Sequence, residues 1–231
     1  MRNRSDFPDK HRPRRISEIY GQQHIKKVIA CGIDDGSLTN AMMFHGPSGT
    51  GKTTIARIIG MGLNCEKGRS SEPCGKCNSC RMVINDSHLA YFELNSANVT
   101  GIDHMRRFRE NFYTSSFDSS TYQIFVFDEC HRLSAEAQTL LLKEVEDCFS
   151  ANYFIFCSTD PEKILKTLRN RCMSFEFKAI PAEEMKRLLK DVCEKEQVIH
   201  NPDVLERIVK ESEGMARNAL YLLQQKIMQL T

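Results

Sequence analysis

Residues 42–60 read MMFHGPSGTGKTTIARIIG, in which an apolar segment leads into a glycine-rich turn and then into a helical pattern. The turn, from Gly46 to Thr53, matches the pattern GxxxxGK(S/T). Glycines at these positions let backbone N–H groups face a phosphate chain, Lys52 can reach the β and γ oxygens, and the Thr53 hydroxyl can ligate Mg²⁺. The stretch therefore predicts a phosphate-binding loop between a strand and a helix.

Working outward from this loop, five short apolar segments rich in β-branched and aromatic residues predict buried strands. They cover residues 41–45, 89–94, 122–127, 152–157 and 174–177. Helical patterns separate most of them, and this alternation is typical of a parallel sheet with helices on both faces. We therefore predict an α/β fold built on a five-stranded parallel sheet.

The pattern changes after Phe177. Pro181 precedes an amphipathic helical pattern, and two more helical patterns follow near residues 202–213 and 215–230. We predict a nucleotide-binding domain over residues 1–178 and a small helical domain over residues 179–231, a division consistent with a chain of 231 residues.

The composition limits the classes of partner. The chain has 32 basic and 30 acidic residues and a formal net charge of +2. This balance excludes a general basic field for nucleic acid, so any DNA or RNA contact must be local or shared with partners. No apolar segment is long enough to span a membrane or to act as a signal peptide, which favours the cytosol.

A second motif, QIFVFDECH, ends an apolar segment in two carboxylates, Asp128 and Glu129. Side chains at the carboxyl ends of parallel strands meet at one edge of the sheet, beside the phosphate-binding loop. There, Asp128 would hold Mg²⁺ together with Thr53, and Glu129 would orient and polarise an attacking water. The pair favours nucleotide hydrolysis over nucleotide storage.

Two further positions are candidates for sensing or stabilising the γ-phosphate. Thr159 follows the next predicted strand, although an isolated threonine there can equally be a strand-end cap. Arg169 and Arg171 precede the last predicted strand; such arginines are usually solvated, but one presented to a neighbour's nucleotide stabilises the transferring phosphoryl group.

Four cysteines, Cys65, Cys74, Cys77 and Cys80, follow the helical pattern after the loop with the spacing C-x8-C-x2-C-x2-C. Two-residue gaps allow tight turns whose backbone N–H groups point at the sulfurs, and four thiolates complete a closed tetrahedral Zn²⁺ site. An iron–sulfur site and free or disulfide-bonded thiols remain as alternatives. The segment 65–80 is polar, so we expect it to require the metal for folding, and we interpret it as a zinc module inserted in the first domain.

Together these motifs resemble the AAA+ ATPases of the clamp-loader group, and within it the bacterial gamma/tau subunit family. The likeness runs over nearly the whole chain: HRPRRISEIYGQQHIKKVI at the start, GPSGTGKTT, DECH, STDPEKILKTLRNRC and finally EGMARNAL. It implies an AAA+ domain followed by a helical lid domain. It also supports zinc, because gamma/tau subunits have a four-cysteine zinc module at this position.

The resemblance implies roles for individual residues. Thr159 corresponds to the residue called sensor 1, Arg171 to the arginine finger acting on the adjacent subunit's ATP, and Arg217 to the lid residue that contacts nucleotide. With Lys52, Asp128 and Glu129, Thr159 and Arg171 form the expected catalytic set. The expected ATP-binding residues are Arg12, Pro13, Tyr20, Gly21, Gly46, Pro47, Ser48, Gly49, Thr50, Gly51, Lys52, Thr53, Thr54 and Arg217.

The chain also departs from the family pattern. Asn170 stands where the family usually has serine. In the segment whose basic residues face DNA in the family, this chain has Val99 and Gly101 and keeps only Thr100 and Arg106. The family's carboxyl-terminal collar domain is not included in the 231 residues, so the sequence is either part of a longer chain or a short natural relative, viral for example.

The leading hypothesis is an ATPase motor subunit of a clamp loader. ATP binding and hydrolysis, with Mg²⁺, would drive loading of a sliding clamp onto primer–template DNA, and the partners would be other clamp-loader subunits in a ring, the clamp and the DNA. One alternative is a DExH-type helicase, for which the chain is short of a second RecA-like domain. The other is a scaffold subunit that binds nucleotide with little turnover.

Overall fold

The computed structural model of the chain describes residues 6–97, 102–113, 121–147, 151–199 and 201–229. Its centre is a five-stranded sheet of β1 (Ala41–His45), β2 (Tyr91–Asn95), β3 (Gln123–Asp128), β4 (Asn152–Ser158) and β5 (Met173–Glu176). The order is β2-β3-β4-β1-β5 with parallel pairing throughout, which confirms the predicted fold class.

The bounds of β1 are the predicted ones, and the ends of the other strands differ from the predicted ones by at most two residues. The largest difference is at β2, which starts at Tyr91 and not at Leu89. Leu89 lies in the preceding turn and is 69% exposed, so it is an apolar residue outside the core. Apolar character alone cannot separate such a turn residue from the strand that follows it.

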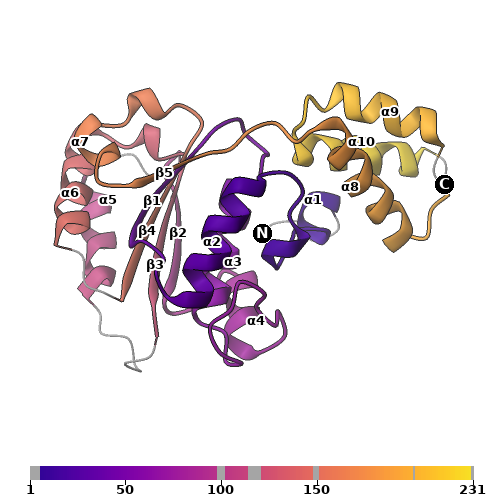
Figure 1. The fold of residues 1–231 in the computed structure, drawn as a ribbon. Helices are drawn as coiled ribbons and strands as arrows, with labels where there is room; N and C mark the ends of the chain where they lie inside the picture. The colour runs from indigo at the N-terminus through magenta and orange to yellow at the C-terminus, as the bar shows by residue number, and fades with distance from the viewer. Residues whose placement is uncertain (1–5, 98–101, 114–120, 148–150, 200, 230–231) are drawn as a thin grey trace.

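Helices cover both faces of the sheet (Figure 1). On one face, α2 (Gln23–Asp35) and α3 (Lys52–Leu63) pack against a core that includes Met42 and Phe44. On the other face, α5 (Ile102–Arg109), α6 (Ala135–Glu146) and α7 (Lys166–Arg169) pack against a core that includes Met43. Successive strand residues point to opposite faces of the sheet, so a strand such as β1, which is covered by helices on both faces, must be apolar nearly throughout.

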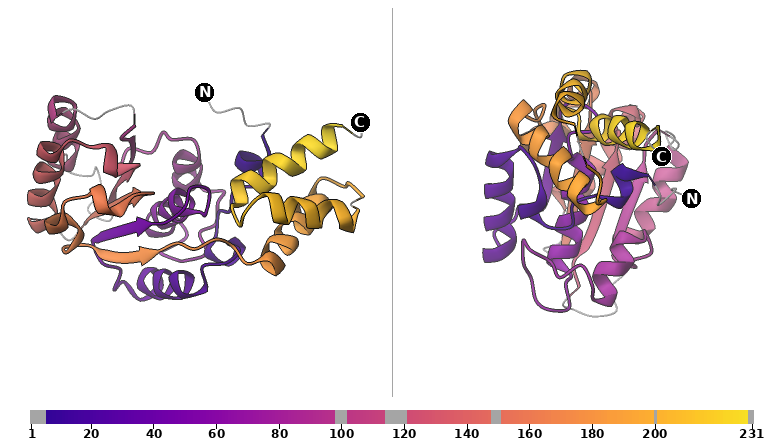
Figure 2. Two further views of the ribbon diagram at one scale, coloured as in Figure 1. Left: turned by 90° about the horizontal axis from the view of Figure 1, so that it is seen from above. Right: turned by 90° about the vertical axis from the view of Figure 1, so that its right-hand side faces the viewer.

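The last three helices, α8 (Ala182–Lys195), α9 (Pro202–Glu211) and α10 (Ala216–Met228), form a separate helical cluster beside the sheet (Figures 1 and 2). Phe7, from the short helix α1 (Phe7–Lys10), is buried in the core of this cluster, and its backbone N–H donates to Gln224 Oε1 (2.9 Å). The start of the chain therefore packs on the lid helices. The boundary at residue 179 stays a prediction.

The connection from β5 to α8 is held by Gln22, the residue before α2. Its Nε2 donates to the Lys178 carbonyl (2.6 Å), and its Oε1 accepts from the Lys178 N–H (3.2 Å). Two residues later, the Ile180 N–H donates to the Gly214 carbonyl (2.9 Å). These bonds fix the direction in which the chain enters the lid helices.

Residues 65–84 form a compact insert after α3 that ends in α4 (Asn78–Ile84). Ser71 donates to Asp34 of α2 through its N–H (2.7 Å) and its hydroxyl (2.9 Å). Glu72 accepts from the N–H (2.8 Å) and the hydroxyl (2.6 Å) of Ser17. The Ile16 N–H also donates to the Ser71 carbonyl (3.2 Å), and Val83 of the insert packs into the core under α2 and α3. The insert is thus attached to the body of the domain by hydrogen bonds and by core packing. Among the described residues, none of the helices has the length and apolar character needed to cross a membrane.

Candidate nucleotide site and metal centre

The phosphate-binding loop lies between the carboxyl end of β1 and the start of α3, as predicted. Gly46, Gly49 and Gly51 all have positive φ angles, of 138°, 76° and 105°. Gly46 also approaches the chain after β5 so closely that an added Cβ would lie 2.1 Å from the Phe177 carbonyl oxygen. Only glycine fits there, because a side chain would be strained by both the backbone angle and this contact.

Lys52 is 6% exposed, and its ammonium group donates to the carbonyls of Gly46 (2.7 Å) and Pro47 (2.8 Å). Burial lowers the pKa of the Lys52 amine, while nearby groups, including Glu129 and Asp128, act in the opposite direction. Loop carbonyls thus hold the ammonium group of Lys52 in the pocket. When a nucleotide binds, its phosphate oxygens would compete with these carbonyls for the hydrogen bonds of Lys52.

The two acids of β3 meet the loop. Thr53 Oγ1 donates to Asp128 Oδ2 (3.1 Å), which places the predicted Mg²⁺ ligands side by side. Burial, aided by the charge of Glu93, raises the pKa of the Asp128 carboxyl. A half-buried carboxylate and a hydroxyl in contact are oxygen donors suited to Mg²⁺, and a cation there would relieve the cost of the partly desolvated charge.

Glu129 has a left-handed backbone (φ 52°), which directs its side chain away from the strand. Its Oε2 accepts from the Thr159 hydroxyl (3.0 Å) and lies 3.4 Å from His131 Nδ1. The same His131 nitrogen lies 3.2 Å from Ser158 Oγ. The structure therefore brings Thr159 to Glu129, and it adds His131, which the sequence analysis did not single out although it belongs to the quoted DECH motif.

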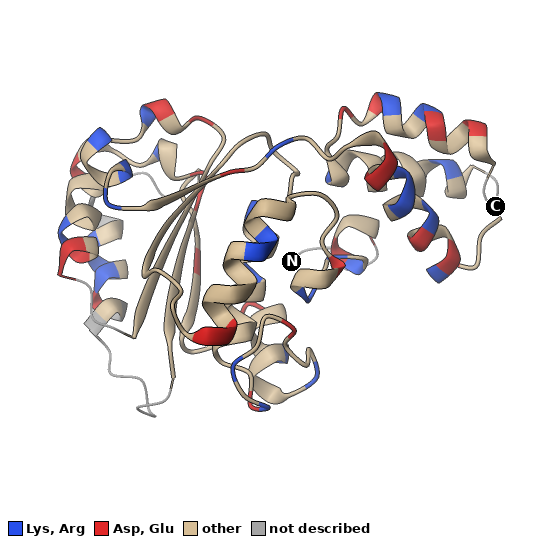
Figure 3. Cartoon of the chain, viewed as in Figure 1, with Lys and Arg blue, Asp and Glu red and all other residues tan. Residues whose placement is uncertain are grey.

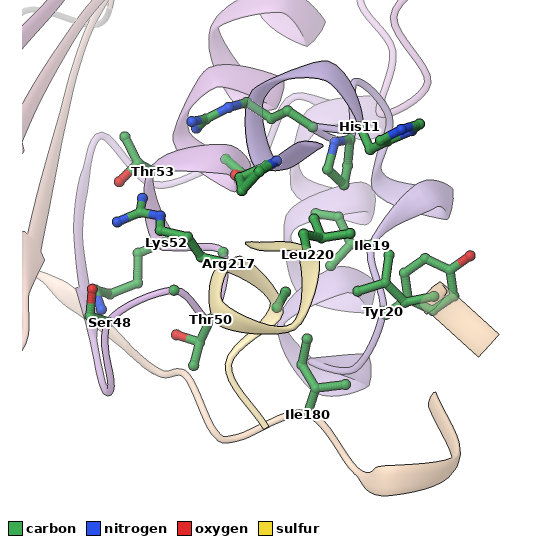
Figure 4. A pocket seen from close by; sticks show the side chains of 18 of the residues that line it. His11, Ile19, Tyr20, Ser48, Thr50, Lys52, Thr53, Ile180, Arg217 and Leu220 are labelled. Atoms are coloured by element: carbon green, nitrogen blue, oxygen red, sulfur yellow. The ribbon is translucent and has the colours of Figure 1, made fainter. Parts of the chain in front are cut away.

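A pocket at this edge of the sheet is closed by the lid and by the start of the chain (Figure 4). It is lined by the predicted residues Arg12, Pro13, Tyr20, Ser48, Gly49, Thr50, Gly51, Lys52, Thr53, Thr54, Asp128, Glu129 and Arg217. Residues that the sequence analysis missed complete the lining: Pro8, His11, Ile19, Ile180, Leu188, Ala216 and Leu220. Several of these are apolar, so the pocket combines a polar end at the loop with an apolar end suited to a nucleobase.

The lid and the amino-terminal segment are fixed around this apolar end. The Tyr20 hydroxyl donates to Asp191 of α8, and the Gly21 N–H donates to Glu184 Oε2 of the same helix (2.5 Å). Gly21 itself does not line the pocket, and neither do Gly46 and Pro47. Arg217 extends from the first turn of α10 toward the loop and lies close enough to Lys52 for its charge to lower the pKa of that amine (Figure 4).

Arg171 lies elsewhere. It precedes β5, and its guanidinium forms an ion pair with Glu146 of α6 and donates to the Thr167 carbonyl (3.2 Å). It lines a shallow hollow with Ala41, the first residue of β1. Because the strands are parallel, this hollow is at the amino edge of the sheet, opposite the phosphate-binding loop. Arg171 is therefore exposed and away from the nucleotide pocket of its own chain.

The four predicted cysteine ligands come together. Their sulfur atoms all lie within 4.8 Å of one another. Sulfurs bound to one Zn²⁺ at about 2.3 Å would be roughly 3.8 Å apart, so the cluster fits such a site with only a small contraction. The Cys77 N–H lies 3.3 Å from Cys74 Sγ, and the Cys80 N–H lies 3.4 Å from Cys77 Sγ. The turns thus direct N–H groups at sulfur, as the two-residue gaps predicted.

Most of the segment that corresponds to the family's DNA-facing residues is not among the described ones. Val99, Thr100 and Gly101 lie outside the described residues. Arg106, the remaining basic residue of that segment, is on α5 and exposed.

This sheet order, with a phosphate-binding loop after β1, two acids at the end of β3 and a helical lid over the pocket, defines the chain as an AAA+ ATPase fold. The sequence model of the family described as "DNA polymerase III, delta subunit" matches residues 21–181, and one described as "RCF1/5-like, AAA+ ATPase lid domain" matches residues 187–228. Since the first match covers more than half of the chain, the chain belongs to this DNA polymerase III family.

Similar curated proteins carry gamma and tau names. The chain is 34% identical over 218 residues to DNA polymerase III subunit gamma/tau of Mycobacterium bovis, which covers 94% of the chain and 38% of that protein. It is 32% identical to subunit tau of Escherichia coli (94% and 34%) and 36% identical to subunit gamma of Buchnera aphidicola from Schizaphis graminum (93% and 59%). The chain thus spans between about one third and three fifths of the length of these relatives.

A solved structure with the same fold is the Thermotoga maritima RuvB Holliday junction branch migration motor. It superposes with a TM-score of 0.69 at 20% identity and covers 95% of this chain and 66% of that one. At this identity the likeness supports the fold. The gamma/tau relatives confirm the resemblance expected from the motifs.

Proposed function

We propose that the chain is an ATPase motor subunit of a clamp loader, in which ATP binding and hydrolysis drive loading of a sliding clamp onto primer–template DNA. The observation that carries this proposal is the division of the catalytic residues between two edges of the sheet. Lys52, Thr53, Asp128 and Glu129 surround one pocket, whereas Arg171 lies at the opposite edge. A site complete only when a second subunit supplies its arginine is suited to an assembly that hydrolyses ATP on demand.

The residues of the pocket have distinct roles in this proposal. Lys52 and the loop N–H groups bind the phosphates, and Thr53 with Asp128 holds Mg²⁺. When bound, Mg²⁺ neutralises charge on the β- and γ-phosphates. Glu129 orients and polarises the attacking water, and Thr159 keeps the Glu129 carboxylate in place through its hydroxyl. Arg217 and the apolar residues of the lid line the nucleotide pocket, so bound nucleotide contacts them and can shift the position of the helices α8 to α10.

ATP hydrolysis by the purified chain, measured with and without partner subunits, clamp and primer–template DNA, tests the motor. We expect stimulation by clamp and DNA and loss of turnover in Lys52→Ala and Glu129→Gln. Retained nucleotide binding with no stimulation under any combination would instead favour the scaffold alternative. The helicase alternative receives no support, because the described residues after 179 form helices without a second sheet.

The role of Arg171 in a neighbouring site is tested by mixing variants. Arg171→Ala and Glu129→Gln should each be inactive alone, and their mixture should recover part of the activity, because some sites then combine an intact Glu129 with a neighbour's intact Arg171. Arg169→Ala is the matched control, since Arg169 is a neighbouring arginine of the same segment but not the one that corresponds to the arginine finger. No recovery on mixing would refute action between subunits.

We also propose that Cys65, Cys74, Cys77 and Cys80 hold one structural Zn²⁺. The closed set of four sulfurs leaves no position for substrate, so the metal would stabilise the insert and not take part in hydrolysis. Elemental analysis should find about one zinc per chain, and Cys77→Ser should lose it with a lower melting temperature. Cys31→Ser, which changes an exposed cysteine outside the cluster, should keep it. Iron in place of zinc would overturn the assignment.

A further inference from the structure

A second hollow runs between the amino-terminal segment 9–14 and the insert that holds the four cysteines. Its deeper part has Met61, Val83 and Ile84 among its lining residues. An adjoining part continues along the insert and shares Arg14, Ile84 and Asn85 with the first, so the two are continuous. We call this hollow the module groove; it is lined by Asp9, Lys10, Arg12, Pro13, Arg14, Arg57, Met61, Gly75, Lys76, Arg81, Val83, Ile84, Asn85 and Asp86.

The rim of the module groove is basic. Arg14, Lys76 and Arg81 are exposed, and their side chains have no acidic partner in the described part of the chain. In Figure 3, basic positions occur along the loop of the insert and on the segment that faces it. Cations that are not neutralised within a protein attract an anionic partner, the more so when several of them border one hollow.

The acidic residues of the insert, by contrast, are engaged. Glu66 Oε1 accepts from the Ser79 N–H (3.0 Å), and Glu72 accepts from Ser17, as described above. Asp86 pairs with the buried Arg57 (2.7 Å). Across the groove, Asp9 pairs with Arg12 (2.7 Å). Asp9 and Asp86 are the acidic residues that line the groove, and each is neutralised by an arginine of the chain, whereas Glu66 and Glu72 keep their charge but do not line the groove. The positive charge of the rim therefore remains.

The floor of the groove indicates the kind of anion. Pro13 and Ile84, which are partly exposed, offer an apolar surface that a phosphodiester backbone cannot cover, whereas Met61 and Val83 are buried (2% and 0% exposed). None of the residues that line the groove is aromatic, so nucleobases would find no side chain on which to stack. An acidic peptide with an apolar side chain satisfies both features, because its carboxylates reach the rim while its apolar group covers the floor.

We propose that the module groove is a docking site for an acidic segment of a partner protein, in which carboxylates flank an apolar anchor residue. Arg14, Lys76 and Arg81 bind the carboxylates, and Ile84 contacts the anchor. The insert thereby gains a function separate from nucleotide hydrolysis: with the amino-terminal segment, it forms a recognition surface on the outside of the ATPase domain.

Fluorescence anisotropy with the zinc-loaded chain and a labelled peptide Asp-Asp-Leu-Asp-Asp-Phe tests the proposal. We expect saturable binding that weakens as salt is added. Arg14→Ala and Arg81→Ala should each weaken binding about threefold and together about tenfold, the size expected for exposed ion pairs. Lys67→Ala is the matched control, because Lys67 is an exposed cation of the same insert that does not line the groove.

A second peptide, in which serine replaces both Leu and Phe, should bind much more weakly. Equal binding of the two peptides, no binding of the first at low salt, or stronger binding of a single-stranded oligothymidylate would each overturn the proposal. Zinc content and melting temperature of every variant show whether the insert is intact. Loss of peptide binding in variants that keep both is therefore loss of the docking site itself.

Discussion

The buried arginine Arg57 provides a sharp test of how the insert is connected to the nucleotide site. It extends from α3, and its side chain is 8% exposed. Its Nη2 lies 2.6 Å from Glu93 Oε2 on β2 and 2.7 Å from Asp86 Oδ1, just after α4. Desolvation lowers the pKa of Arg57, but the charge of Glu93 and other neighbours outweighs it and the net shift is upward. One guanidinium therefore connects the phosphate-binding helix, the edge strand β2 and the insert.

The two carboxylates around Arg57 predict unequal costs. Glu93 has only 11% of its side chain exposed, so Arg57→Met would leave a buried charge without its main partner and cost roughly 3 to 5 kcal/mol. Asp86 is 47% exposed, so Asp86→Asn should cost less than about 1 kcal/mol. For a chain of this size, the first substitution lowers the melting temperature by roughly 10 °C and the second by a few degrees at most.

A double-mutant cycle separates the lost ion pair from lost packing. If the cost of Arg57→Met comes from the uncompensated Glu93, then adding Glu93→Gln should restore stability relative to Arg57→Met alone. Urea unfolding followed by circular dichroism provides the free energies. A double variant no more stable than Arg57→Met, or an Arg57→Met protein as stable as the wild type, would refute the reasoning. Arg57→Met should also bind Mg²⁺-nucleotide less well than the wild type at low pH, because the charge of Glu93, no longer balanced by Arg57, would raise the pKa of Asp128 further.

Three further predictions concern stability around the pocket. Asp128→Asn should raise the melting temperature of the nucleotide-free chain by a few degrees and abolish Mg²⁺-dependent hydrolysis. The reason is that a carboxyl whose pKa is raised on folding destabilises the fold once the pH exceeds its unfolded pKa. A lower melting temperature in a calorimetric scan at neutral pH would contradict this. Gly46→Ala should lower the free energy of unfolding by more than about 3 kcal/mol, and Gly51→Ala by only about 1 to 2 kcal/mol. Both glycines have positive φ, but only at Gly46 would the added Cβ lie against a backbone carbonyl. Equal melting temperatures of the two variants would count against this reasoning. Hydrogen bonding from Lys10 holds the pKa of Glu196 below its usual value, so the Glu196 carboxylate stabilises the fold above about pH 4.5 and loses this effect as the pH falls through the folded pKa. The difference in melting temperature between the wild type and Glu196→Gln should therefore shrink in acid. A constant difference would show that the interaction is not electrostatic.

Part of the site could be predicted because its residues are contiguous. The loop from Gly46 to Thr53 determines its own conformation through glycine at positive φ, and the pair Asp128 and Glu129 follows directly from the end of an apolar strand. The cysteine spacing likewise implied N–H groups directed at sulfur, as observed at Cys77 and Cys80. In each case the chemistry lies within a few residues of chain.

The rest of the pocket could not be predicted, because it is made of single residues from distant segments. His11, Ile19 and Leu220 belong to quoted segments but were not singled out there, and Ile180 lies in no quoted segment; all four become pocket residues only when α10 and the amino-terminal segment pack together. Gln22 is a similar case: its role as the clamp on the backbone of Lys178 depends on where the chain leaves β5.

The sequence by itself determined the parallel sheet, the phosphate-binding loop, the acids of β3 and the cysteine cluster, because these follow from periodicity, glycine and short fixed spacings. Only the tertiary structure decided that Arg171 lies at the amino edge of the sheet, that Phe7 packs among the lid helices and that the insert and residues 9–14 form a basic groove with an apolar floor. The physical reason is that these features depend on which surfaces pack against each other, and such packing is set by the whole chain and by no single segment.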